Sequence, residues 1–248
     1  MKYTVLSLFP EIVDAFFSLS LLAKAVERKI IDYRSINIRD FAFDKHKTCD
    51  DAPYGGGAGM LMMAEPLAYA LESAGVKSKN SGSHRVIYLS PSGKALKQDM
   101  AKELSREEEL ILICGRYEGI DQRVIDMYVD DEISVGDYVL SSGESAAIVL
   151  IDATYRLLDE VITPASLEEE SFAKGLLEYP QYTRPEIYAN MKVPDILLSG
   201  HHENIRKWRL RKGIEKTLRN RPDLIEHGME TGLFDSETRT IINEIKQE

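Results

Sequence analysis

Glycine, proline and polar residues directly follow runs of apolar residues at three places in the chain. Residues 114–121, reading Cys-Gly-Arg-Tyr-Glu-Gly-Ile-Asp, come after the apolar run 110–113. Residues 89–91, reading Leu-Ser-Pro, end a second such run, and residues 135–144 contain the third. Since glycine permits a positive φ and lets a ligand approach the main chain closely, these turns are candidates for binding a small molecule.

The three turns are expected to form one cleft. In an open parallel sheet, ligands bind outside the carboxyl ends of the strands. A cleft built from such turns is lined mainly by backbone N–H and C=O groups, which suits a ligand with an adenine edge. An ordinary strand-to-helix turn explains any one stretch alone. The chain lacks both the Gly-x-x-x-x-Gly-Lys-Ser/Thr phosphate loop and a Gly-x-Gly-x-x-Gly after its first strand, which argues against an enzyme of nucleotide phosphates.

A cluster of basic residues is the second candidate site. Residues 206–221 hold eight cations and one anion, Glu215, so this stretch is locally +7 in a chain of net charge −10, and it contains Trp208, the only tryptophan. A solvated helix face with the tryptophan packed beneath it explains the pattern. The alternative is a surface that contacts the phosphate backbone of a nucleic acid. A non-catalytic RNA-binding protein is the competing class, but such a protein has no use for the predicted cleft.

The remaining polar candidates have ordinary explanations. Arg156 is expected at the end of an apolar helix, where the helix dipole favours a cation. The acidic segment 159–178 reads as a solvated linker. His201 and His202 follow a turn, with no third ligand at zinc spacing. The two cysteines, Cys49 and Cys114, have no metal-ligand spacing and fit a reducing cytosol better than a disulfide scaffold.

Composition sets the outer limits. The chain has 248 residues, enough for one large domain or two modest ones, and its pI of about 5.1 does not suggest a protein that coats nucleic acid. The first residues run into a strand instead of a signal sequence, and no apolar run reaches membrane-spanning length. We therefore expect a cytoplasmic protein.

Strands and helices alternate over the first 160 residues, which predicts an α/β domain with a mostly parallel sheet. The first helix is expected over 10–28, burying Ile12, Phe16, Leu19 and Leu22 or near neighbours. After a linker at 161–175, residues 176–248 are expected to form a small helical domain in which Ser199 and Ser236 cap helices. The strands are expected at 3–9, 31–41, 85–89, 110–113 and 132–140. Further helices are expected at 65–75, 94–104, 146–158 and 202–219, and two more are expected to begin at residues 121 and 222.

The motifs, taken in order, resemble the bacterial tRNA (guanine-37-N1)-methyltransferases of the TrmD type, which belong to the SPOUT methyltransferases. Any one motif is weak, but their joint order is specific and covers nearly the whole chain. The matching stretches are 7–10, 53–60, 88–91, 114–121, 135–140, 182–185 and 197–201.

The resemblance implies a C-terminal trefoil-type knot in the α/β domain, whose strand-end loops hold S-adenosylmethionine. It also implies an obligate homodimer with active sites at the interface and a requirement for Mg²⁺, for which no ligand can be named. The cofactor-binding residues that it implies are Tyr88, Leu89, Ser90, Pro91, Gly115, Tyr117, Glu118, Val135, Gly136, Asp137, Tyr138, Val139, Leu140 and Gly143.

The implied reaction is methyl transfer to N1 of guanine 37 in the tRNA anticodon loop, giving 1-methylguanosine. Guanine N1 carries a proton, so a base must remove it and a cation must stabilise the charge on O6. The resemblance assigns these roles to Glu170 and Arg156, with Glu168 and Glu169 as solvated linker charges. The family usually has aspartate at position 170 and glycine at Ser142. The implied tRNA-binding residues are Asp50, Arg184, Ser199, His201, Arg209, Arg211 and Arg219.

Overall fold

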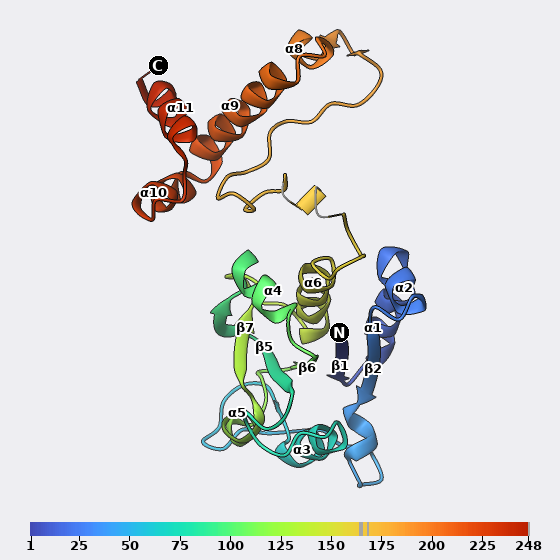
Figure 1. The fold of residues 1–248 in the computed structure, drawn as a ribbon. Helices are drawn as coiled ribbons and strands as arrows, with labels where there is room; N and C mark the ends of the chain where they lie inside the picture. The colour runs from blue at the N-terminus through green and yellow to red at the C-terminus, as the bar shows by residue number, and fades with distance from the viewer. Residues whose placement is uncertain (164–165, 168, 248) are drawn as a thin grey trace. The chain divides into compact units, whose positions relative to one another are not determined.

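The chain divides into two compact units, each with a hydrophobic core of its own (Figure 1). The computed structural model describes residues 1–163, 166–167 and 169–247. The first unit comprises Met1–Ile162 and the second Thr163–Glu248. No helix in the described part of the chain is both long and apolar enough to cross a membrane.

A five-stranded sheet forms the centre of the first unit. Every neighbouring pair of strands is parallel, and the strands lie in the order β2-β1-β6-β5-β7. The prediction of an α/β fold with a parallel sheet is therefore confirmed. The strands are β1 (Lys2–Ser7), β2 (Asp32–Asn37), β5 (His84–Ala95), β6 (Glu109–Cys114) and β7 (Asp131–Ser134).

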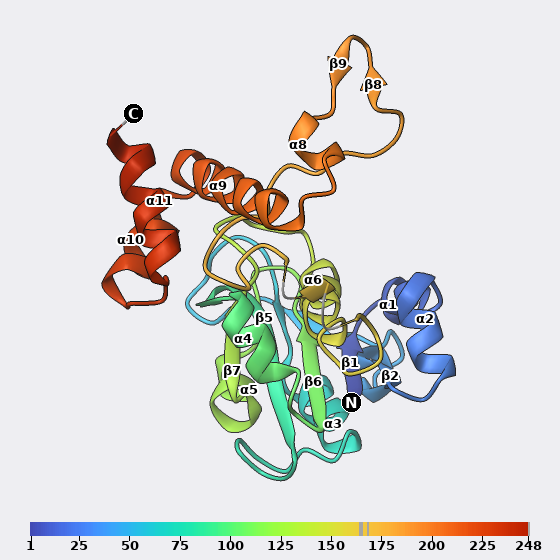
Figure 2. The same ribbon diagram turned by 45° about the horizontal axis from the view of Figure 1, so that its top comes forward.

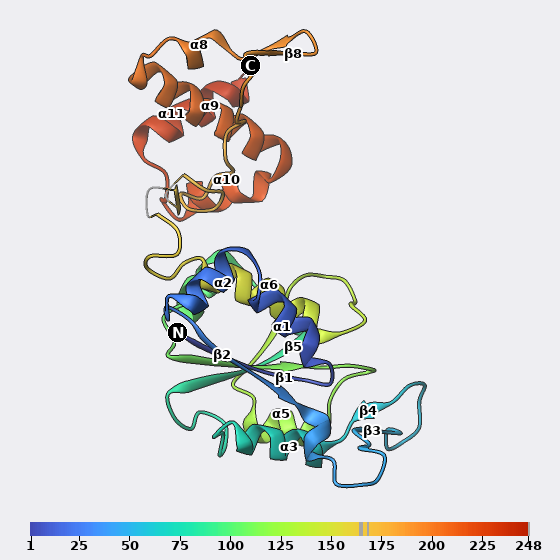
Figure 3. The same cartoon turned by 90° about the vertical axis from the view of Figure 1, so that its right-hand side faces the viewer.

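Helices cover both faces of the sheet, as Figure 3 shows with the sheet nearly edge-on. Residues alternate between the faces because successive side chains of a strand point to opposite sides. In β6, Leu110, Leu112 and Cys114 enter one core cluster, and Ile111 and Ile113 enter the other. The first cluster is closed by α1 (Pro10–Phe17), α2 (Ser20–Glu27), α4 (Gln98–Leu104) and α6 (Gly143–Tyr155), and the second by η1 (Ile38–Phe41), α3 (Ala64–Ser73) and α5 (Gln122–Tyr128).

The single helix predicted over 10–28 is wrong, because the chain breaks it into α1 and α2. Ser18 ends α1, and Ser20 takes a positive φ of 59°. The buried positions of α1 are Val13 and Phe17, whereas Ile12 and Leu19 are 42% and 63% exposed. Leu22 is buried as predicted. The break changes the helix direction, so a single 3.6-residue period does not carry through the whole segment.

Four predicted strands also end at other residues, the first of them β1, which stops at Ser7 where the prediction ran to residue 9. β2 stops at Asn37, whose side chain accepts a hydrogen bond from the backbone N–H of Arg39 and opens η1. β7 stops at Ser134. β5 instead continues to Ala95, because Leu89 and Lys94 both pair with Ile133 and residues 90–93 bulge out between them. Consequently α4 begins only at Gln98.

The second unit is mainly helical (Figure 2). Its core consists of Ile214, Ile225, Phe234 and Ile242. The predicted cap at Ser236 is wrong, because Asp235 accepts the hydrogen bond from the backbone N–H of Thr238. Its elements are the hairpin β8 (Ile187–Tyr188) and β9 (Met191–Lys192), which the sequence analysis missed, and α8 (Asp195–Leu198), α9 (His202–Asn220), α10 (Pro222–Glu230) and α11 (Ser236–Gln247).

The start of α6 lies directly against the end of β6. The backbone N–H of Gly143 donates to the carbonyl oxygen of Gly115 over 2.8 Å. A Cβ at Gly143 would lie 2.6 Å from the Gly115 nitrogen and 2.8 Å from the Cys114 Cα. Since both neighbours are backbone atoms that cannot turn aside, this contact admits only glycine.

Gly143→Ala therefore tests the packing of α6 on β6. Because the added methyl group overpacks a backbone contact, we expect the free energy of unfolding in urea to fall by about 1–3 kcal/mol. Ser145→Ala, at an exposed position of the same helix, is the matched control and should change stability by less than about 0.5 kcal/mol. Equal stability of the two variants would contradict the observed packing.

Candidate functional site

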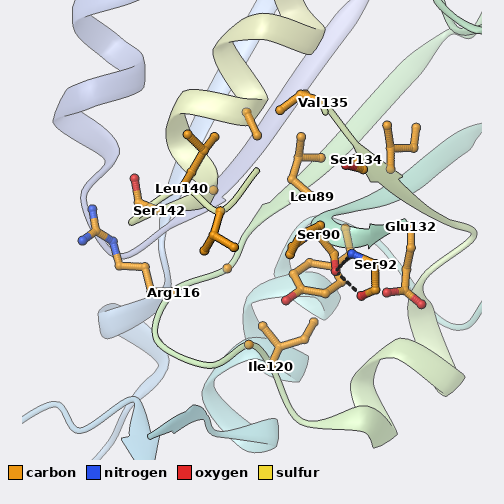
Figure 4. Close-up of a pocket in the computed structure, with 18 of the residues that line it drawn as sticks. Leu89, Ser90, Ser92, Arg116, Ile120, Glu132, Ser134, Val135, Leu140 and Ser142 are labelled. Atoms are coloured by element: carbon orange, nitrogen blue, oxygen red, sulfur yellow. Dashed lines mark hydrogen bonds between the residues drawn. The ribbon is translucent and has the colours of Figure 1, made fainter. Parts of the chain in front are cut away.

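A cleft of about 440 Å³ opens at the carboxyl ends of β5, β6 and β7. Figure 4 shows Arg116 and Ser142 at one side of this cleft and Glu132 at the other. The cleft is lined by the bulged part of β5, by β7, by the loops that follow β6 and β7, and by the first residues of α6. This is the edge of the sheet where the sequence predicted that the three turns would meet.

The structure brings together all of the predicted cofactor-binding residues in the lining except Asp137. Asp137 belongs to the loop after β7 but does not line the cleft. The sequence analysis missed several lining residues, some of them inside the recognised stretches 114–121 and 135–144 and others between or beside the motifs. These are Ser92, Arg116, Gly119, Ile120, Gln122, Ile125, Glu132, Ile133, Ser134, Ser141, Ser142 and Ala146.

The bulge of β5 shapes one wall of the cleft. Its two serine hydroxyl groups, on Ser90 and Ser92, are hydrogen-bonded over 2.7 Å (Figure 4), and the backbone N–H of Ser92 donates to the Ser90 Oγ. Gly93 then passes so close to the backbone of Ile133 that a Cβ would collide with it. The bulge is thus stabilised by the hydrogen bonds between Ser90 and Ser92 and by the close contact of Gly93 with β7.

A second wall is formed by Gly115 and Tyr88. A Cβ at Gly115 would lie 2.8 Å from Cε2 of Tyr88 and 3.0 Å from its hydroxyl oxygen. Burial raises the pKa of Tyr88, and the nearby Glu132 raises it further. Tyr88 therefore stays protonated at neutral pH.

A buried charge network supports the cleft from below. Glu144 is fully buried, accepts a hydrogen bond from Ser7 Oγ over 2.5 Å and lies 3.4 Å from Nη2 of Arg116. The Arg116 guanidinium lies 4.3 Å from the ring centroid of Phe9, a cation–π geometry. Burial, with Glu144 nearby, raises the pKa of the Cys114 thiol well above its usual value. The network joins β1, β6 and α6 at the point where the cleft opens.

The glycine-rich loop, residues 53–60, and the residues just after it are hydrogen-bonded to the loop that follows β6 and lines the cleft. The backbone N–H of Glu118 donates to the Met60 carbonyl, and that of Met62 donates to the Gly119 carbonyl. Met62 ends β4 (Leu61–Met62), which pairs with β3 (Asp50–Asp51). Burial and then Asp50 raise the pKa of Tyr117, and Arg39 acts in the opposite direction. Asp50, which was predicted from the resemblance to contact tRNA, therefore lies near a cleft residue.

Most cations of the predicted basic cluster pair with carboxylates. Arg206 pairs with Glu203 and Glu237, the second of which comes from α11. The local charge counted along the sequence is therefore offset by acids that the fold brings to α9. Further pairs are Lys207–Glu203, Arg211–Glu215, Arg211–Glu244, Lys212–Glu215 and Arg221–Asp223.

Other predicted RNA-binding residues of the second unit are exposed. Arg219 lies on the last turn of α9, and within the described residues no carboxylate is at ion-pair distance from it. Arg184, Ser199 and His201 are also exposed. Ser199 Oγ accepts a hydrogen bond from the backbone N–H of His201, so the side chain holds the turn just before α9. Trp208 lies on α9 with its ring 6.4 Å from that of Tyr182.

Among the acidic residues expected to form a solvated linker, Glu169 differs from the prediction. Arg156 caps the C-terminus of α6, as expected for a cation there. Glu170 belongs to the second unit. Glu169 is not simply solvated, because it accepts a hydrogen bond from the Tyr179 hydroxyl over 2.8 Å and lies 3.8 Å from Nη1 of Arg209. Glu168 lies outside the described residues.

No metal site is evident in the part of the chain that the structure describes. Among those residues, no group of three or more histidine, cysteine, aspartate or glutamate side chains is arranged to hold a metal ion. The cysteines, Cys49 and Cys114, are both free and buried.

A parallel α/β sheet with a cleft at the ends of its strands, followed by a helical unit rich in arginine and lysine, is the architecture of a class of proteins that bind a small ligand at the edge of the sheet. Residues 1–227 match the family described as tRNA (Guanine-1)-methyltransferase TrmD, and the chain belongs to this family.

Three relatives named tRNA (guanine-N(1)-)-methyltransferase illustrate the similarity. The protein of Treponema denticola is 61% identical over 248 residues, which is 100% of both chains. That of Treponema pallidum is 55% identical over 248 residues, covering 100% of this chain and 97% of the relative. That of Borrelia duttonii is 61% identical over 226 residues, covering 90% of this chain and 92% of the relative.

Glu144→Ala tests the buried network beneath the cleft. The variant leaves Arg116 without its carboxylate and Ser7 without its acceptor, so we expect the free energy of unfolding to fall by about 3 kcal/mol. Ser7→Ala removes one hydrogen bond to the charged group and should cost about 1.5 kcal/mol. Urea unfolding of the two single variants measures both. A Glu144→Ala variant as stable as the unmodified protein would refute the network.

Proposed function

We propose that this chain transfers a methyl group from S-adenosylmethionine to N1 of guanine 37 in the tRNA anticodon loop, giving 1-methylguanosine. The observation that carries the proposal is the family match over residues 1–227, with 61% identity to a relative over the whole chain. Family membership makes the chain a tRNA (guanine-N1)-methyltransferase. The position in the anticodon loop and the residue roles are the further parts of the proposal.

The cleft at the strand ends suits S-adenosylmethionine. Its volume of about 440 Å³ lies within the range typical of small-molecule sites. At Gly115 a Cβ would collide with the Tyr88 ring, so glycine is what allows these two parts of the cleft wall to lie this close together. The cofactor supplies a methyl group already activated by the sulfonium. The bulge of β5 and the loops after β6 and β7 hold and orient the ligand and exclude water, which is the contribution that proximity requires.

The proposed chemistry at the guanine requires a base and a cation. Glu170 removes the N1 proton, and Arg156 stabilises the negative charge that develops on O6. A glutamate reaches one methylene further than the aspartate usual in the family, and its carboxylate is a competent base. The general base makes N1 nucleophilic, because the lone pair of the neutral purine is tied up in the N1–H bond.

The two units have separate roles in the proposal. Residues 1–160 bind the cofactor, residues 161–175 connect the units, and residues 176–248 bind tRNA. Arg219 supports the third assignment, because it is exposed near the end of a basic helix. Asp50, Arg184, Ser199, His201, Arg209 and Arg211 are the other RNA-contacting residues of the proposal.

The proposal also includes a trefoil-type knot, a homodimer with active sites at its interface, a cytoplasmic location and Mg²⁺ as a counter-ion at the base or the tRNA. The close contact of Gly143 with the end of β6 supports the knot, because it draws the chain after β7 tightly back against the loop after β6.

Gly115→Val should weaken S-adenosylmethionine binding, because the added side chain collides with the Tyr88 ring that forms the cleft wall. We expect at least a tenfold rise in Kd by calorimetry, equivalent to about 1.4 kcal/mol. Gln122→Ala, at an exposed lining position in the first turn of α5, should change Kd less. Normal affinity of Gly115→Val for S-adenosylmethionine would place the cofactor elsewhere. ATP is the control ligand, which should not bind.

Glu170→Gln tests the proposed base, since glutamine keeps the size of glutamate but cannot accept the proton. With a tRNA transcript carrying guanine 37, the single-turnover rate should fall by roughly two to four orders of magnitude. Binding of tRNA and cofactor should change little, and Glu170→Asp should keep appreciable activity. Glu226→Gln, an exposed acid of α10, is the control. Methylation of a transcript that carries adenine at position 37 at the same rate would contradict guanine 37 as the nucleotide that is methylated.

A further inference from the structure

Glu169 is anchored to the second unit through two side chains. The Tyr179 hydroxyl donates a hydrogen bond to Glu169 over 2.8 Å. The Arg209 guanidinium lies 4.7 Å from the centroid of the Tyr179 ring, and its Nη1 is 3.8 Å from Glu169. Burial and the hydrogen bond to Glu169 raise the pKa of Tyr179, which keeps the phenol a donor at neutral pH. One tyrosine thus contacts both partners of the ion pair.

The residue on the other side of Glu170 is held as well. Ser171 Oγ accepts a hydrogen bond from the backbone N–H of Glu178 over 3.1 Å. The backbone N–H of Phe172 donates to the Leu176 carbonyl over 2.8 Å. The residues immediately before and after Glu170 are therefore both tied to the segment 176–179.

This segment is itself fixed to α9. The backbone N–H of Leu177 donates to Thr217 Oγ1, and Thr217 is fully buried. The Leu177 carbonyl lies so close to α9 that a Cβ at Gly213 would come within 3.0 Å of it. Tyr179 contacts α9 through Arg209. A continuous set of contacts therefore runs from the buried side of α9 to both neighbours of Glu170.

We propose that Glu169, Tyr179 and Arg209 form a positioning cluster that holds the Glu170 carboxylate in the orientation needed to remove the guanine N1 proton. The inference rests on the proposed function, in which Glu170 is the base. The cluster acts through Glu170 and does not itself touch the guanine. It separates two adjacent glutamates by role, one as an anchor and one as the base.

Magnitudes indicate where the effect of this cluster appears. The side chains of Glu169 and Arg209 are 59% and 41% exposed, and ion pairs at such exposure contribute little to stability. Catalysis is far more sensitive, because a misplacement of about 1 Å costs up to about a hundredfold in rate. Loss of the anchor should therefore lower the rate while leaving the folded state intact.

Tyr179→Phe is the test, because it removes only the hydroxyl that holds Glu169. At saturating S-adenosylmethionine and tRNA, the single-turnover rate should fall about 3- to 10-fold, as expected for one lost hydrogen bond. The Kd values for tRNA and cofactor and the Tm should not change. Tyr182→Phe is the matched control and should keep the unmodified rate. Tyr182 lies three residues after Tyr179, and its ring packs against that of Trp208.

Glu169→Gln and Glu169→Ala define the role of the acid. Glutamine still accepts a hydrogen bond from Tyr179, so its loss of rate should be smaller than that of alanine. In the Glu169→Ala background, Tyr179→Phe should have no further effect, because both changes break one interaction. Independent, multiplying losses would overturn the inference.

Glu170→Gln distinguishes failure of this inference from failure of the proposed function. If Glu170→Gln loses activity while Tyr179→Phe and Glu169→Ala keep the unmodified rate, the cluster is wrong and the base stands. If Glu170→Gln keeps the unmodified rate, the base assignment fails and the cluster with it. A large loss in Glu169→Gln with little loss in Glu170→Gln makes Glu169 the base, and a drop in tRNA affinity or Tm without a change in saturated rate makes the cluster merely structural.

Discussion

The backbone contact between Gly143 and the end of β6 is the constraint on which the cleft depends. It brings the first turn of α6 against Cys114 and Gly115, with no room for a side chain. It also buries Glu144, which accepts a hydrogen bond from Ser7 and whose charge is balanced by Arg116. Because a buried carboxylate needs such partners, the contact fixes β1, β6 and α6 together. The loops that leave these elements are therefore held in place at the points where they begin.

A cleft made from rigid main chain suits the chemistry of this family. The methyl donor brings its own activation, so the protein gains most by holding it in place and least by adding catalytic side chains there. Ionisable residues that do chemistry on the guanine belong instead to other segments, Arg156 and Glu170 in the proposal. The cations of α9 are paired mostly with exposed carboxylates, which are weak partners that an RNA phosphate can replace. A net charge of −10 for the chain is therefore compatible with the RNA-binding surface proposed for α9.

The sequence predicted the parts of the fold that depend on local pattern. The apolar run 110–113 identified β6, and the turns that follow strands identified most of the cleft. The break near Ser18 was missed because Ile12 and Leu19 continue a plausible helical period that the turn at Ser20 interrupts. The β8–β9 hairpin was missed because its two turn residues, Ala189 and Asn190, both take a positive φ, and alanine gives no signal for that conformation. The Arg116–Glu144 pair depends on the approach of the loop after β6 to the first turn of α6, which no local pattern encodes.

The acidic run shows most clearly what sequence leaves open. Neighbouring glutamates have the same intrinsic chemistry, so composition assigns them all to a solvated linker. The structure distinguishes Glu169 because the Tyr179 hydroxyl and Arg209 both reach it. Once Glu169 and Ser171 are anchored, the backbone of Glu170 between them has little freedom. A base held in this way loses less conformational entropy on substrate binding than one in a free linker, and that entropy otherwise adds to the barrier.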